Sequence, residues 1–413
     1  MPGSDIRRVL AAEAVSNFGT MLSRLAIPWL AALSLQATPL QIAALLVADV
    51  VAAALGALWL GGWIDRRGKR QLMVWADGAR GGLLALLAVA AGTGFITMPL
   101  LVAAAAASGL LTVAFELARS AWMAQRVALA ELPQTNAQLS VAGSLSETVA
   151  FAVGGWLYQG LGAAWALAVD ALSYAVSALC LRRVAEAPGA AEGRAPGASR
   201  WQALRLDVAG GLRAIAEHPA LRALAGVQAL LAFSMALTGT SYMIYVSRDV
   251  AMPTAQIGMI AALGALGAVA GASLAPRLGR RLGPGWAMAI GLAGFAIGAA
   301  FIPLAQVPGW AAVGWLVAHQ IVGDAGHTLH DVHDRTLRQT AVAPALLARV
   351  DAGIRAAEQA ATLAGAVIGG LLGTAADARS VMWAAAAVAG AAAALAAWRL
   401  AGQRALAGPA TPG

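Results

Sequence analysis

The residues best suited to chemistry are three histidines and two aspartates that lie close together in the sequence. They are His327, His330, Asp331, His333 and Asp334. Imidazole and carboxylate groups bind divalent transition metals, and the i, i+4 spacing of His327 and Asp331 places both on one face of a helix. The preferred interpretation is a polar helix end without a ligand, because no second segment supplies matching His or Cys ligands. A metal site at His327, His330 and Asp331 is the alternative.

A second set of ionisable side chains is isolated within long apolar runs. Charged residues in such surroundings are costly and usually face a cavity or a partner. A carboxylate in this position has the chemistry to take up and release a proton. We predict that the following residues line a central cavity and couple proton movement to it: Asn17, Thr20, Arg24, Asp49, Glu147, Asp324 and Glu358. Hydrogen bonding between helices is the alternative for the uncharged members.

The composition sets the class of protein that must position these residues. The 413 residues are 60% hydrophobic and only 12% charged, about half the charge of a soluble domain. The single cysteine, Cys180, excludes an internal disulfide framework and zinc-type clusters. The net charge of +8 fits cytoplasmic loops of a membrane protein better than a nucleic-acid partner. The glycine-rich runs Gly258–Gly271 and Gly365–Gly373 predict close helix packing. Neither run contains a lysine for a phosphate-binding loop, so we expect no cofactor, no catalytic residue and no enzymatic activity.

Apolar runs long enough to cross a bilayer recur along the chain. They predict an all-α polytopic membrane protein with twelve spans, at residues 9–34, 40–61, 72–91, 98–120, 138–158, 164–182, 220–245, 256–276, 286–304, 310–335, 352–374 and 381–400. A Gly/Ala/Pro-rich linker and an amphipathic segment separate six spans from six. The predicted domains are therefore residues 1–183, a cytoplasmic linker at 184–219, and residues 220–413.

The stretch GGWIDRRGKR, residues 61–70, is a short charged turn between two apolar runs. Its informative members are Gly61, Asp65, Arg66, Gly68, Lys69 and Arg70. Two glycines permit a tight turn, and Asp65 is a lone acid among cations. A degenerate copy with the same spacing begins at Ala272 and has Pro276 in place of the acid. Internal repeats of this kind are typical of transporters built from two similar bundles.

This motif resembles the loop between helices 2 and 3 of the major facilitator superfamily of secondary transporters. Further stretches, at residues 14–30, 115–121, 170–174 and 328–339, resemble its type 3 drug:proton antiporter branch, the macrolide-efflux and siderophore-exporter proteins. That branch usually carries an acid where Thr20 stands and a basic residue where Asp49 stands. The resemblance implies two six-helix bundles related by a pseudo-two-fold axis. It also implies that Asp65 and its neighbours form a conformational latch, with Arg119 as a partner by analogy.

Taken together, the residues and the resemblance predict a secondary active exporter of small amphipathic or hydrophobic molecules. We expect alternating access driven by protons, in a monomer within the cell membrane, with a small-molecule substrate and no nucleic-acid partner. The alternatives are an importer or a divalent metal-ion carrier that uses the histidine cluster.

Arg24 and Asp49 are predicted to lie at equal depth in the bilayer. The first hairpin turns near Gln36, and the two residues lie at almost equal distances on either side of it. Ten helical residues at about 1.5 Å each place both roughly 15 Å below the surface, near the bilayer centre. An unpaired arginine there costs about 3 kcal/mol, so we expect a cross-hairpin ion pair, either structural or functional.

The distribution of arginines predicts that both chain ends are cytoplasmic. Cations gather at Arg7 and Arg8, at 66–70, at 277–281 and at Arg399, which the positive-inside rule places on one side. A reporter that is active only outside the cytoplasm should be silent when fused after Arg404 and active when inserted in the loop 306–309. The reverse pattern would contradict the orientation.

Overall fold

The computed structural model describes residues 2–65, 67–128, 131–186, 200–342 and 344–400. Within these ranges every regular element is a helix and there is no strand, which confirms the predicted all-α class. The helices are α1 (Pro2–Trp29), α2 (Pro39–Asp65), α3 (Lys69–Thr93), α4 (Met98–Arg126), α5 (Leu132–Arg182), α6 (Arg200–Glu217), α7 (Pro219–Ile244), α8 (Thr254–Ala262), α9 (Gly264–Leu282), α10 (Pro284–Phe301), α11 (Trp310–Ala341), α12 (Pro344–Ala375) and α13 (Ala378–Arg399).

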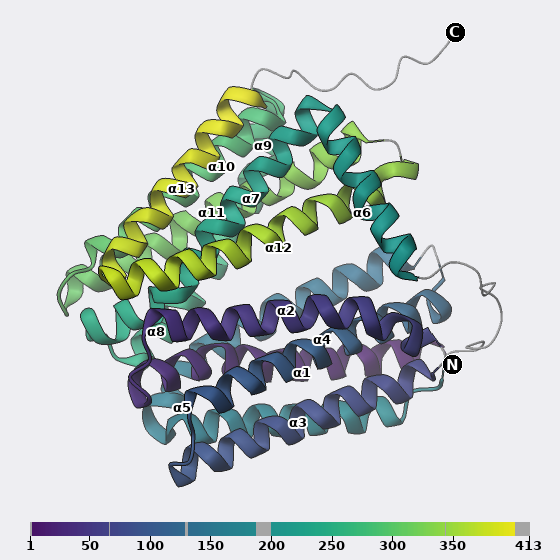
Figure 1. Ribbon diagram of the computed structural model, residues 1–413, viewed down its shortest axis with the longest axis vertical. Helices are drawn as coiled ribbons and strands as arrows, with labels where there is room; N and C mark the ends of the chain where they lie inside the picture. Colours follow the sequence, from purple (N-terminus) through teal and green to yellow (C-terminus); the bar gives the residue numbers. More distant parts are fainter. Residues whose placement is uncertain (1, 66, 129–130, 187–199, 343, 401–413) are drawn as a thin grey trace. The chain divides into compact units, whose positions relative to one another are not determined.

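The chain divides into two compact units. The first comprises Met1–Ala37, Ala44–Arg200 and Pro253–Ala262. Its helices α1, α3, α4 and α5 lie alongside one another, and α8 packs on α5 (Figure 1). Its apolar core joins α1, α3, α4 and the end of α5 and includes Met73, Phe115 and Trp122. The polar site described below lies among these same helices.

The second unit comprises Thr38–Ala43, Trp201–Met252 and Leu263–Gly413. Within it α7 packs on α12 and α13, while α11 packs on α9 and α10. Its core includes Val227, Met288, Leu292 and Ile354. Within this unit, the predicted amphipathic segment forms α6, in which Gly211 lies against the backbone of α12 at Gly353.

Nine helical segments of the described chain are long and apolar enough to cross a bilayer. One of them, Gln134–Arg182, reverses direction at Gly162, where φ is +82°. Glycine adopts this backbone conformation without steric cost, and the turn separates the predicted spans 138–158 and 164–182. Helices α1 and α11 are not among the nine; each contains several ionisable side chains, such as Glu13 and Arg24 in α1 and Asp324 and Asp331 in α11. With these two and the divided helix, the described chain contains the twelve predicted spans.

The same corner occurs at the end of the first span of each unit. A π-helical turn covers Leu30–Ser34 in one and Tyr245–Asp249 in the other. Each is followed by a non-glycine residue with positive φ, Gln36 at 51° and Ala251 at 53°. The next helices begin at Pro39 and Thr254, so every equivalent pair is 215 residues apart. The backbone thus repeats where the side chains do not, as expected of a duplicated bundle.

The predicted eighth span is interrupted rather than continuous. Helix α8 ends at Ala262 and α9 begins at Gly264. At Gly264 a side chain would meet Gln320 Nε2 at 2.7 Å and the carboxylate of Asp324. The close approach of α11 to this glycine accompanies the break, a packing constraint that hydropathy alone does not reveal.

Helix α13 begins at its N-cap residue, Asp377. The carboxylate accepts a hydrogen bond from the Ser380 backbone N–H at 2.6 Å, which satisfies one of the free N–H groups of the first turn. This hydrogen bond lowers the pKa of the Asp377 carboxyl below its ordinary value. The cap lies in the short connection between α12 and α13.

The glycine-rich runs pack helices closely, as predicted. A Cβ atom at Gly267 would lie 2.5 Å from the carbonyl oxygen of Ile321 and 3.0 Å from its Cα atom. A Cβ atom at Gly369 would lie 3.1 Å from the Cα atom of Leu237. Small residues of this kind let membrane helices approach one another.

Gly267→Ala should therefore lower the midpoint of thermal unfolding in detergent. The neighbouring atoms belong to the backbone of α11 and cannot rotate away, and such overpacking costs about 1–3 kcal/mol. Gly390→Ala is the matched control, since nothing lies within 4 Å of its Cβ position and alanine favours the helix. Equal unfolding midpoints for the two variants would contradict the close packing.

Candidate functional site

A buried arginine is the centre of the polar site in the first unit. Arg80 extends from α3 between the rings of Phe115 on α4 and Tyr174 on α5, with its Cζ atom 4.6 Å and 4.5 Å from their centroids. Its guanidinium forms an ion pair with Asp77, one turn earlier on α3. Stacking on aromatic faces and pairing with a carboxylate together offset the loss of hydration.

Hydroxyl groups complete the surroundings of this pair. Ser177 donates a hydrogen bond to Asp77 Oδ2 at 2.6 Å, and Arg80 donates to the Tyr174 hydroxyl at 3.4 Å. The Tyr174 hydroxyl is 2.8 Å from Thr20 Oγ1, which also lies 2.8 Å from the Ser16 carbonyl oxygen. These contacts form one chain of hydrogen bonds from α3 through α5 to α1. Because Tyr174 accepts from Arg80 and Thr20 can donate to Ser16, Tyr174 is the donor to Thr20.

Thr20 is the predicted cavity residue that belongs to this network. The others, Asp77, Arg80, Tyr174 and Ser177, were not predicted as site residues. A usable signal was present, because an acid and an arginine three residues apart interrupt the apolar run 72–91 and such pairs face each other on a helix. Whether Tyr174 and Ser177 reach Arg80 and Asp77 depends on the rotation of α5 about its axis. The spacing of residues in the sequence does not reveal this rotation.

A second ion pair joins α1 to α4. Arg119 Nη1 contacts the Glu13 carboxylate, and both side chains are about four-fifths buried. Arg119 was predicted as the partner of Asp65, whose side chain lies outside the described residues, as do Gly61 and Arg66. The Glu13 contact therefore adds a partner for Arg119, and the pairing with Asp65 stays a prediction.

The described part of the charged turn is held by an acid from the expected linker. Glu186 accepts hydrogen bonds from the backbone N–H groups of Arg70 at 2.9 Å and Gln71 at 3.4 Å. A Cβ atom at Gly68 would lie 2.6 Å from its Oε2 atom, so the glycine makes room for the carboxylate. Lys69 donates to the Arg67 carbonyl oxygen at 3.1 Å. Glu186 thus occupies the N-terminus of α3, where a negative charge is stabilised.

Arg24 and Asp49 do not form a direct ion pair in the described residues. Arg24 contacts the Met21 sulfur at 3.6 Å, whereas Asp49 is close enough to feel the Arg24 charge and lies against Gly109 of α4. Both side chains are exposed at the protein surface. Their functional pairing stays a prediction.

The remaining predicted cavity residues are distributed over both units. Asn17 donates to the Gly143 carbonyl oxygen at 3.2 Å, an interhelical bond between α1 and α5. Glu147 is exposed and Glu358 is half-buried. In the second unit Gln320 donates to Asp324 Oδ2 at 3.2 Å.

The histidine cluster of α11 does not converge on one point. His330 is 3.0 Å from Gln228 Oε1, and His333 is 3.1 Å from the Ala275 carbonyl oxygen. The His327 ring packs on Phe295 with centroids 5.7 Å apart, and Asp331 lies 3.9 Å from Arg335. The described chain contains no group of three or more His, Cys, Asp or Glu side chains that could hold a metal ion. His330 and His333 are buried and lie within hydrogen-bonding distance of α7 and α9 of the same unit.

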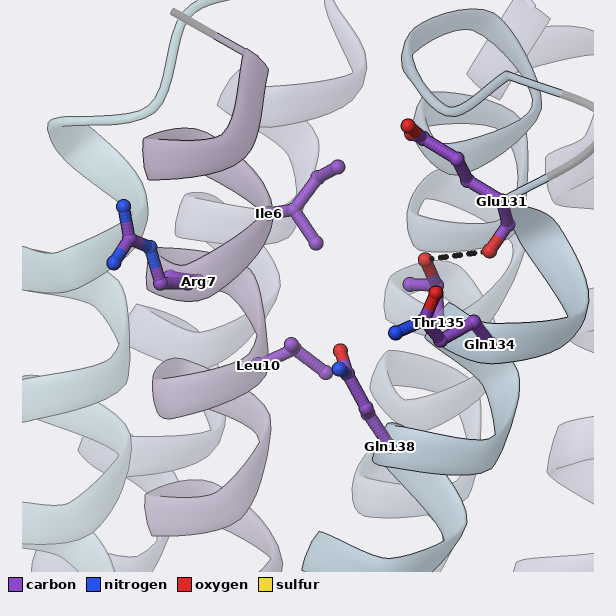
Figure 2. Close-up of a pocket in the computed structure, with 7 residues that line it drawn as sticks. All are labelled: Ile6, Arg7, Leu10, Glu131, Gln134, Thr135 and Gln138. Carbon is purple, nitrogen blue, oxygen red and sulfur yellow. Dashed lines mark hydrogen bonds between the residues drawn. The ribbon is translucent and has the colours of Figure 1, made fainter.

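A small surface cavity of about 300 Å³ lies between the beginnings of α1 and α5. Figure 2 shows Ile6, Arg7 and Leu10 on one wall and residues of α5 on the other. Thr135 donates to the Glu131 carbonyl oxygen at 3.0 Å, so one hydroxyl of the lining is satisfied within its own helix. The lining mixes apolar and polar groups and is open to solvent.

The sequence matches the model of the Major Facilitator Superfamily over residues 9–329. No curated protein matches it. Among solved structures, the fold is similar to a mutant of the nucleoside transporter NupG, at 13% identity and a TM-score of 0.77, over 95% of this chain and 100% of that chain. It is also similar to an inward-facing bacterial homologue of the iron transporter ferroportin, at 17% identity and 0.74, over 97% and 99% of the two chains. A third, a bacterial metal transporter, has 18% identity and 0.68, over 95% and 97%. At these identities the likeness concerns the fold.

Asp77→Asn should destabilise the first unit by about 3–5 kcal/mol, because it leaves the buried Arg80 charge without its counter-ion. Arg80→Met in the same chain should recover much of this loss, since it removes the unpaired charge. The unfolding free energies of the two single variants and the double variant form the test.

Arg213→Gln is the matched control, because its ion pair with Glu217 is exposed and should be worth at most about 1 kcal/mol. Additive losses in the double variant would show that Asp77 and Arg80 are not energetically coupled.

Proposed function

The chain belongs to the Major Facilitator Superfamily, a family of membrane transporters, and from this membership we propose that it is a secondary active exporter of small amphipathic or hydrophobic molecules. The observation that carries the proposal is the buried network around Arg80. Ionisable groups within membrane helices are costly and mark transport or proton pathways. The close packing at glycines and the apolar cores could hold the helices together without buried charge.

Coupling to protons is supported by the balance of charge in the spans of the first unit. Carboxylates outnumber cations there, with Glu13, Asp49, Asp77, Glu116, Glu147 and Asp170 opposed by Arg24, Arg80, Arg119 and Arg182. Carboxylates without a cation are stable in an apolar setting when they are protonated. Proton binding at such groups can therefore bias one orientation of the carrier over another.

The charged turn is proposed as the latch between orientations. Gly68, Lys69 and Arg70 lie at the start of α3, where Glu186 holds the backbone. In the proposal, Asp65 and Arg66 provide charges that form and break contacts as the carrier changes state. Both termini and this turn face the cytoplasm, and the protein acts as a monomer in the cell membrane.

Transport should be measured in inverted vesicles with an acidic lumen, across a panel of amphipathic compounds. We expect accumulation that disappears when the pH gradient is collapsed. Asp49→Asn should abolish gradient-driven accumulation and leave binding measurable, because only the titratable group is lost. Asp65→Asn should preserve expression and reduce turnover.

The control is Asp377→Asn, which changes an exposed helix cap and should transport normally. Accumulation of a divalent metal ion, lost on replacement of His327, His330 and His333 by Asn, would favour the metal-carrier alternative. Accumulation unaffected by the gradient would contradict proton coupling.

A further inference from the structure

Asp170 is a buried carboxylic acid that neither the sequence motifs nor the network around Arg80 assigns to a role. It lies on α5 in the first unit, and 1% of its surface is exposed. The hydroxyl of Ser173 lies 3.2 Å from its Oδ1 atom. The hydroxyl of Ser23, from α1, lies beside the same carboxyl group.

No cation forms an ion pair with Asp170 within the described residues. Arg80 is the cation whose charge reaches it, but Arg80 already contacts Asp77 and is enclosed by two aromatic rings. The Asp77–Arg80 pair is neutral as a whole. An ionised Asp170 would therefore leave one uncompensated negative charge in the buried cluster, whereas a protonated Asp170 leaves none.

The other titratable groups near this position are accounted for. On α3 they are Asp77 and Arg80, and on α5 the nearest is Tyr174, which bonds to Arg80 and Thr20. On α1, Glu13 pairs with Arg119 and Arg24 contacts Met21. Helix α8 contains no ionisable side chain. The groups that touch Asp170 are thus hydroxyls, which stabilise a carboxylate less than a cation does.

The packing around Asp170 also fits a protonated acid. Ser23 Oγ is buried beside this carboxyl group, where it can accept from a carboxylic O–H group. A Cβ atom at Gly19 would overlap the Asp170 carboxyl and lie 2.8 Å from Ser173 Cβ. The backbone of α1 therefore packs directly on the acid, which is 1% exposed to solvent.

We propose that Asp170 is a proton-binding site that is protonated while α1 is packed on α5. One proton from water binds the carboxylate and gives a carboxylic acid that donates to Ser23. Its release to water needs the α1–α5 seam to open at Gly19, which links the protonation state to the movement of α1. The use of this proton to drive transport rests on the proposed function.

The test is the infrared pH-difference spectrum of the purified protein without substrate. Wild type should show a protonated carboxyl band that is lost on titration from about pH 5 to about pH 9. Asp170→Asn, which keeps the shape of the side chain, should lack this band. Asp377→Asn should keep it, since Asp377 is an exposed acid that is ionised over this range.

A band that persists unchanged in Asp170→Asn would overturn the proposal. So would a wild-type spectrum that responds to sodium against choline at constant pH and loses this response in Asp170→Asn, which would assign the site to a metal cation. In vesicles, Asp170→Asn should reduce the gradient-driven accumulation ratio to about one while substrate exchange continues. If no efflux is found but the band titrates through Asp170, the proton site stands and the exporter function falls.

Discussion

The constraint on which this structure depends is that charge inside a membrane protein needs a nearby compensating group. Arg80 shows how much of the fold that requirement determines. Its guanidinium contacts an acid on its own helix and lies between the rings of Phe115 and Tyr174, on two others. Moving α4 or α5 away would remove an aromatic face from the charge. The mutual positions of α3, α4 and α5 therefore determine how one buried cation is compensated, in addition to forming the apolar core.

The two units meet this constraint in related ways. The first buries Asp77 with Arg80, one turn apart on α3, and adds two aromatic rings and a hydroxyl group. The second buries Asp334 with Arg338, one turn apart on α11, and Arg338 also contacts Asp351 of α12. The first unit differs in Asp170, a buried acid with no ion pair within the described residues. That acid is the feature that requires a functional explanation.

Much of the fold could be predicted from the sequence, because the length of an apolar run and the chemistry of a turn are local properties. The spans, the reversal near Gly162 and the close packing of the glycine runs belong to this class. The partners of the site residues do not. The equal depth of Arg24 and Asp49 follows from counting residues, but contact also depends on helix rotation, and Asp49 instead lies against Gly109. Glu186 was treated as linker because nothing local indicates that it returns to the N-terminus of α3.

The turn after the first span of each unit shows which part of the repeated fold is physically constrained. Gln36 and Ala251 both have positive φ, a conformation that costs a non-glycine residue about 1–2 kcal/mol. No sequence similarity between the corners requires them to share it. In both units a π-helical turn precedes this residue, and the next helix begins three residues after it. Side chains, by contrast, have diverged freely, and Pro276 stands where the first copy has Asp65. The two units therefore share the backbone geometry of this corner, while the side chains that surround buried charge differ between them.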